Sequence, residues 1–95
     1  MDKKSALKLL MKTLFYDLKE EGSGTQRYSK LINGEEVIIS FLDNEGVCDF
    51  CDWEVRVEYP DNDLRVRLHV QLMHVRNLIH DIESNFPNKV TDIYH

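Results

Sequence analysis

The chain has few of the residues that cross-link a protein, as cysteine does, or that interrupt helices and strands, as proline and glycine do. Its 95 residues include two cysteines, two prolines and four glycines. Residues 1–21 read MDKKSALKLLMKTLFYDLKEE, and lysines interrupt the apolar positions, so this stretch lacks the continuous apolar run of a signal peptide or membrane span. We therefore expect a cytoplasmic protein with no membrane partner. In that reducing compartment the cysteines are expected to be free thiols or metal ligands, not a stabilising disulfide.

The length and apolar content predict one small folded domain covering residues 1–95. With 42% hydrophobic and 31% charged residues, the chain is too apolar to be disordered. A domain of this size buries only roughly 60 to 65% of the surface that its unfolded chain exposes. Contact with a partner, or formation of a homodimer, would add burial that the chain alone cannot supply.

The negative charge is concentrated in one part of the chain. The formal net charge is −5, yet residues 31–63 alone carry −9, whereas residues 1–30 carry +3 and residues 64–95 carry +1. A block of carboxylates repels phosphate backbones and attracts cations and basic surfaces. The pattern disfavours direct nucleic-acid binding and predicts a partner protein with a basic surface, such as a nucleic-acid-binding protein.

Apolar residues at helical spacing predict a helix at each end of the chain. The first helix is expected within residues 1–21 and the second within residues 74–86, where Pro87 stops it. Gly22 and Gly24 are expected to end the first helix, and residues 87–95 to form a tail. The apolar positions of the first helix are Leu7, Leu10, Met11, Leu14, Phe15 and Leu18.

Residues 27–72 carry the signals of a four-stranded antiparallel sheet. Asn33-Gly34 is a strong hairpin signal, because a type I′ turn needs positive φ at both positions. A two-residue turn there pairs Tyr28 with Ile39 and Lys30 with Val37. The order is α-β-β-β-β-α, so the predicted fold is an α+β two-layer sandwich, in which both helices flank the apolar face of a four-stranded meander.

Polar and apolar residues alternate strictly between Trp53 and Val70. Pairing Tyr59 with Leu64 across the intervening turn places Glu58 opposite Arg65, Glu54 opposite His69 and Arg56 opposite Arg67. One face is then apolar and the other charged. In the preceding hairpin both faces carry apolar side chains, and the face away from the predicted core forms a second candidate interface made of Leu31, Ile38 and Leu42.

The Cys48-Asp49-Phe50-Cys51 stretch is the one local pattern that resembles a chemical motif. Neighbouring carboxylates raise a thiol pKa, so the setting opposes thiol redox chemistry. A zinc-binding module is an alternative, with ligands drawn from Cys48, Cys51, His69 and His74. A single Cys-x-x-Cys without a second ligand pair is weak evidence, so no cofactor is expected. We expect a β-bulge here, with Phe50 turned inward and the aspartates outward.

The sequence favours a binding protein over an enzyme. No nucleophile elbow, phosphate-binding glycine loop or zinc-protease motif is present, although the charged sheet face leaves a small enzyme as a further alternative. Small acidic proteins such as immunity proteins, secretion chaperones and phage-encoded inhibitors act by binding other proteins. We therefore predict a non-enzymatic protein-interaction module that binds its partner through Asp43, Glu45, Asp49, Asp52 and Glu54.

Overall fold

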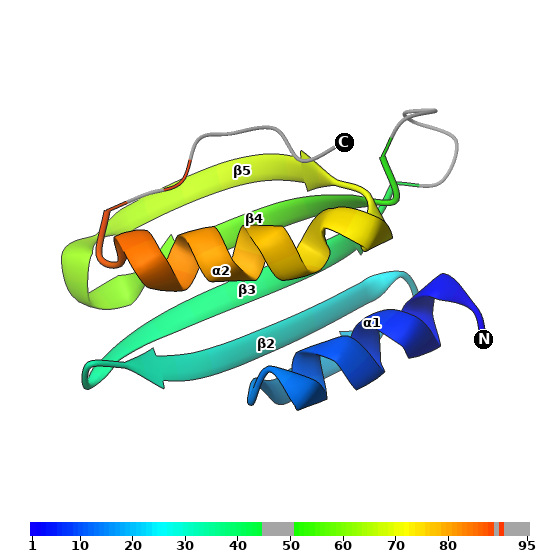
Figure 1. Cartoon of the computed structure of the whole chain (residues 1–95), viewed down its shortest axis with the longest axis horizontal. Coiled ribbons are helices and arrows are strands. Elements are labelled where there is room, and N and C mark those ends of the chain that lie inside the picture. Colours follow the sequence, from blue (N-terminus) through cyan, green and yellow to red (C-terminus); the bar gives the residue numbers. More distant parts are fainter. Residues whose placement is uncertain (45–50, 89, 91–95) are drawn as a thin grey trace.

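Five antiparallel strands lie side by side in chain order, and both helices cover the same face of the sheet (Figure 1). This computed structural model describes residues 1–44, 51–88 and 90. The elements are α1 (Lys3–Thr13), β1 (Asp17–Gly22), β2 (Thr25–Ile32), β3 (Glu35–Asp43), β4 (Trp53–Tyr59), β5 (Leu64–Val70) and α2 (Val75–Asn85), with single 3-10 turns at Pro60–Asn62 and Leu72–His74. The α+β class and the antiparallel meander are confirmed, but the predicted number of four strands is wrong.

The prediction of one helix over residues 1–21 is wrong beyond Thr13. The amide of Phe15 donates to the carbonyl of Lys12, and the amide of Tyr16 donates to that of Met11, both at about the usual hydrogen-bond length (3.0 and 2.9 Å). These two bonds form a Schellman motif, which ends a helix by turning one residue into the left-handed conformation. Phe15 takes that position with φ of 67°. The sequence pattern missed this end because glycine normally occupies it.

The residues expected to complete the first helix form β1 instead. β1 pairs with β2 from Asp17 opposite Ser29 to Gly22 opposite Thr25, with a register irregularity between Leu18 and Glu20. Gly24, expected to stop a helix, makes the tight turn between these strands with φ of 89°. β1 is an edge strand, and all six of its residues are exposed. Because neither of its faces is buried, its sequence lacks the alternation of apolar and polar residues by which a strand is predicted.

The predicted pairings within both hairpins are confirmed. Tyr28 lies opposite Ile39 and Lys30 opposite Val37, and both Asn33 and Gly34 have positive φ. In the β4–β5 hairpin Tyr59 lies opposite Leu64, as predicted, and the remaining predicted pairs of charged residues follow from that register. Side-chain alternation fixes register because a one-residue slip would move every apolar side chain to the solvent face.

The hydrophobic core lies between the sheet and the two helices. α1 contributes Leu7 and Met11, and α2 contributes Val75, Leu78, Ile79 and Ile82. Aromatic rings cross the inner face of the sheet: the ring centroids of Tyr28 and Phe41 are 6.0 Å apart, and those of Phe41 and Trp53 are 6.2 Å apart, both edge to face. Val90, in the predicted tail, is also buried in this core.

The second helix agrees with its prediction to within a residue at each end. Among the residues that the structure describes, neither helix is long and apolar enough to cross a membrane.

Candidate functional site

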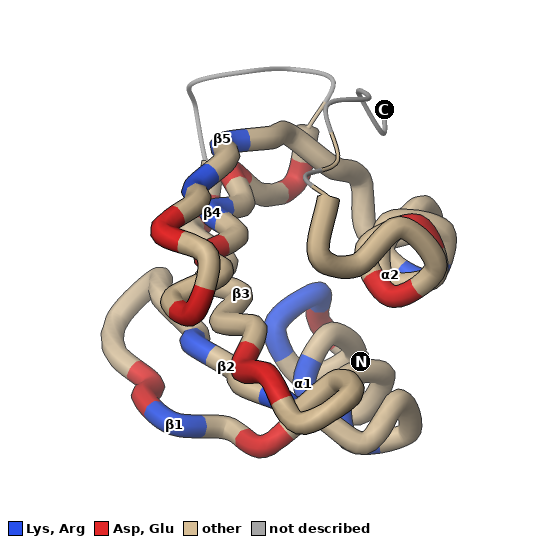
Figure 2. Tube along the Cα trace, turned by 90° about the vertical axis from the view of Figure 1, so that its left-hand side faces the viewer, with Lys and Arg blue, Asp and Glu red and all other residues tan. Residues whose placement is uncertain are grey.

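None of the described residues forms a covering layer over the face of the sheet opposite the helices. Figure 2 shows both helices on one side of the strands, and residues of both charge signs at positions along the strands themselves. We call this surface the outer face. Strand alternation and the observed register assign to its central and β5 side Arg27, Leu31, Ile38, Ser40, Leu42, Glu54, Arg56, Glu58, Arg65, Arg67 and His69.

The second candidate interface lies on this outer face. Leu31 is 69% exposed, whereas Ile38 and Leu42 are half-buried among neighbouring side chains. Leu31 is the diagonal neighbour of Ile38, because Ser29 is the residue directly opposite Ile38. Leu42 lies further along β3, beyond Ser40. The three apolar residues therefore share one face, but only two of them are neighbours.

Arginines from three strands fall on one line across the outer face. Arg27 lies opposite Ser40, Ser40 opposite Arg56, and Arg56 opposite Arg67. We call these four residues the arginine row. The sequence predicted only its Arg56–Arg67 pair. The hairpin register already implied that Arg27 faces Ser40, but the pairing of β3 with β4, which joins the two hairpins, is not predictable from either turn.

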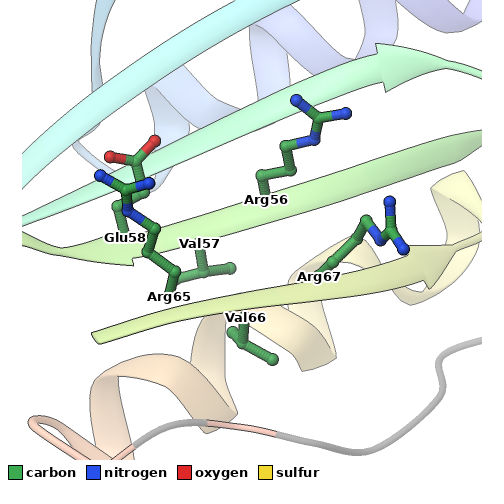
Figure 3. Close-up of a pocket in the computed structure, with 6 residues that line it drawn as sticks. All are labelled: Arg56, Val57, Glu58, Arg65, Val66 and Arg67. Carbon is green, nitrogen blue, oxygen red and sulfur yellow. The ribbon is translucent and has the colours of Figure 1, made fainter. Parts of the chain in front are cut away.

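The arginine row borders a shallow depression of about 320 Å³ between β4 and β5. Figure 3 shows Arg56, Arg65 and Arg67 projecting from the two strands, with Arg65 reaching toward Glu58. The Nη2 atom of Arg56 lies 3.0 Å from a carboxylate oxygen of Glu54. Within the described part of the chain, Arg67 makes no ion pair. Its guanidinium group is exposed and free to bind an anionic partner.

Three of the five carboxylates of the predicted acidic interface are described, and each of the three has a partner within the chain. The Nζ atom of Lys3 lies 2.8 Å from Asp43, whose side chain is only 12% exposed. The carboxylate of Asp52 accepts the Leu72 amide at 2.7 Å, so it stabilises the chain after β5 and does not simply point outward. Glu54 is paired with Arg56. Glu45 and Asp49 lie outside the described residues.

Lys3 is the nearer of two lysines that pair with Asp43 at this end of the sheet, since the Nζ atom of Lys4 lies 3.9 Å from the same carboxylate. The ammonium group of Lys3 also donates to the Asp52 carbonyl at 3.1 Å and lies 4.8 Å from the centre of the Trp53 ring. A cation over an indole face is stabilised by the ring quadrupole. Lys3, in the first turn of α1, therefore contacts residues at the end of β3 and at the start of β4. Its charge offsets the charge of Asp43, a carboxylate that the sequence analysis assigned to a partner.

The proposed zinc ligands are only partly described. Cys51 is half-buried and has an interaction partner in the chain, His69 lies on the outer face opposite Glu54, and His74 ends the 3-10 turn before α2. Across residues 1–44, 51–88 and 90, no three cysteine, histidine or acidic side chains gather as a ligand set. Cys48 and the expected bulge at Phe50 fall outside these ranges, so that zinc hypothesis stays a prediction.

The uncovered outer face and its arginine row are therefore the best-defined candidate site. The residues lining its depression include no thiol, hydroxyl or imidazole group. No protein-family model, curated protein or solved structure matches this chain, and its function is accordingly inferred from the geometry and charge of its surfaces.

Proposed function

We propose that this chain is a non-enzymatic protein-interaction module that binds a partner protein through the outer face of its sheet. The observation that carries the proposal is the combination, on one uncovered face, of an exposed leucine and the arginine row. Apolar anchors and arginines are the residue types that supply much of the energy in protein interfaces. The partner is expected to place apolar side chains over Leu31 and Ile38, and carboxylates opposite Arg67.

The apolar part supports the proposal through the free energy of burial. Leu31 is 69% exposed, and fully burying a leucine side chain contributes roughly 1.5 to 3 kcal/mol. A covering surface would also complete the burial of Ile38, which the chain leaves only half-buried. A single leucine does not define an interface, and the arginine row on the same face supplies the charged contacts of the proposed one.

The charged part supports a carboxylate-bearing partner. Arg56 and Arg67 lie directly opposite each other, and like charges in that position destabilise a sheet. Arg56 is already paired with Glu54, whereas Arg67 is exposed and, among the described residues, makes no ion pair. A guanidinium fork matches a carboxylate in two parallel hydrogen bonds. Binding a carboxylate at Arg67 would relieve the repulsion within the sheet.

The experiment is capture of the partner by cross-linking in cells that express the chain naturally, followed by titration of the identified protein against purified variants. We expect Leu31→Ser and Arg67→Gln each to weaken binding by about tenfold or more, as central interface residues do. Leu9→Ser is the matched control. Leu9 is 55% exposed on α1, on the other side of the molecule, and its replacement should leave the affinity unchanged.

Two results would contradict the proposal. One is an affinity that neither outer-face variant changes. The other is capture of the chain by itself, together with a dimer in sedimentation experiments, since the outer face would then be covered by a second copy.

The acidic end remains the alternative interface for a basic partner, but replacing all five of its carboxylates is not a clean test. Asp43→Asn removes the ion pair with Lys3, and Asp52→Asn weakens the bond to the Leu72 amide. Loss of binding in such variants would be confounded by altered structure. Glu54→Gln is the sharper variant, because among the described residues the carboxylate it removes is paired with the exposed Arg56 alone.

A further inference from the structure

A groove lies on the helical side of the molecule, away from the outer face. It runs between the end of α1 and α2, which Figure 1 shows over the same face of the sheet, and its volume is about 370 Å³. Small-molecule sites in proteins have volumes of roughly 300 to 1,000 Å³ and combine an apolar surface with a few polar groups. The lining residues, from α1 through β2 to α2, are Thr13, Leu14, Phe15, Lys30, Arg76, Ile79, His80 and Glu83.

Phe15 is unusual for its position beside this groove. Its φ of 67° places a bulky residue in the left-handed region, which destabilises a residue other than glycine by roughly 1 to 3 kcal/mol. Its side chain is 81% exposed, so burial within the chain does not offset the strain. A glycine would end the helix at lower free energy. The aromatic ring is therefore better explained by a contact outside the chain.

Within the described part of the chain, the residues that line the groove keep one unpaired positive charge, which lies on Arg76. Glu83 lies on the α2 side, but its carboxylate accepts hydrogen bonds from Tyr16 at 2.9 Å and from Lys30 at 3.0 Å. Its negative charge is thus neutralised inside the chain. Arg76 and His80 lie one helical turn apart on the same face of α2. Arg76 is exposed, and among the described residues it makes no ion pair.

We propose that this groove binds a small amphipathic carboxylate, whose apolar tail packs against Phe15, Leu14 and Ile79 and whose carboxylate group binds Arg76 and His80. The apolar lining and the unpaired guanidinium group lie within a single groove of small-molecule size. A guanidinium group binds a carboxylate through paired hydrogen bonds that are stronger than neutral ones. This site is separate from the proposed interface on the outer face and does not depend on it.

The test uses phenylbutyrate as the probe and phenylbutanol as its uncharged match, each titrated into the full chain and followed by backbone amide shifts in NMR. We expect phenylbutyrate to shift the amides of Leu14, Ile79 and His80, with an affinity about fivefold or more above that of phenylbutanol, as expected for one charge-assisted contact at an exposed rim.

Two variants separate the two halves of the site, and a third serves as the control. Arg76→Gln should lower the affinity for phenylbutyrate about fivefold and leave that for phenylbutanol unchanged, because only the carboxylate contact is lost. Phe15→Gly should weaken both probes, because the aromatic wall is removed while the helix end is kept. Arg65→Gln, on the outer face, is the matched control and should change neither affinity.

The proposal is overturned if phenylbutyrate produces no shifts in the groove at millimolar concentration, or if Arg76→Gln weakens both probes equally. Shifts in the groove that grow with protein concentration in the absence of a probe would also overturn it, since they would identify a second copy of the chain as the occupant.

Discussion

The ammonium group of Lys30 lies 3.0 Å from a carboxylate oxygen of Glu83 and so connects β2 to α2. The same ammonium group donates to the carbonyl of Leu14 at 3.1 Å and lies 5.1 Å from the centre of the Tyr16 ring. The Tyr16 hydroxyl in turn donates to Glu83. One lysine thus joins the end of α1, the sheet and α2 in a network that is partly shielded from water.

Removing Lys30 is expected to destabilise the fold. Lys30→Met should lower the free energy of unfolding by about 1 to 2 kcal/mol, because two hydrogen bonds are lost and the Glu83 carboxylate loses its cation. The measurement is urea unfolding at neutral pH. Lys12→Met is the control, since Lys12 is exposed at the end of α1, and a change below about 0.5 kcal/mol is expected there. Equal effects of both substitutions would contradict the structural role of this network.

The strain at Phe15 predicts that glycine is more stable than alanine at this position. Phe15→Gly should be more stable than Phe15→Ala by about 1 kcal/mol, because alanine keeps the Cβ atom that the left-handed conformation disfavours. Both variants remove the exposed ring, so their difference isolates the backbone term. Thermal unfolding of the pair measures it. A Phe15→Ala variant as stable as Phe15→Gly would show that the residue is not strained.

Two leucines of α1 test the direction in which this helix faces. Leu7 is fully buried and Leu9 is 55% exposed. Leu7→Ala should lower the free energy of unfolding by about 2 to 5 kcal/mol, through lost burial and the cavity left behind. Leu9→Ala on the same helix should change it by less than about 0.5 kcal/mol. Denaturant unfolding of both variants checks the contrast, and similar losses would mean that the helix is rotated.

The buried tyrosines predict a loss of stability at alkaline pH. Burial raises the pKa of Tyr28 to about 12 from its ordinary 10.0, with a smaller contribution from Glu21. Burial also raises the pKa of Tyr16, reinforced by the neighbouring Glu83, and the pKa of Tyr59. The folded state therefore favours the neutral phenols.

Because these pKa values are raised on folding, their contribution is fully present below pH 10.0 and is lost as pH rises toward about 12. Unfolding experiments across that range should show a steady fall in stability, and ultraviolet absorbance should show that these three tyrosines ionise only as the chain unfolds. Ionisation of all three near pH 10.0, with the fold intact, would contradict their burial.

Replacing Arg67 is expected to have opposite effects on the stability of the chain and on partner binding. Arg67→Gln removes a charge directly opposite Arg56, so stability should stay constant or rise by up to about 0.5 kcal/mol. Arg65→Gln is the comparison, because Arg65 lies opposite Glu58 in a favourable pair, and a loss of a few tenths of a kcal/mol is expected. Urea unfolding of both variants tests this. If Arg67→Gln is clearly the less stable of the two, the arginine serves the fold and not a partner.

The sequence was informative where side-chain alternation and turn chemistry coincide. Asn33-Gly34 set the register of one hairpin, and the strict alternation from Trp53 to Val70 set the other. It failed at residues 14–22, where the apolar spacing continued a helix that a Schellman motif ends. The hydrogen bonds of that motif depend on the backbone conformation of Phe15, for which the residue type gives no signal.

By itself, the sequence determined the α+β class, the second helix and the pairings within the two predicted hairpins, because these depend on neighbouring residues and on which side chains avoid water. Only the tertiary structure decided how β3 pairs with β4, and hence that Arg27 joins Arg56 and Arg67 in one row. It also decided that Lys3 neutralises Asp43. Such contacts join residues far apart in the chain, and their geometry is set by packing of the whole domain.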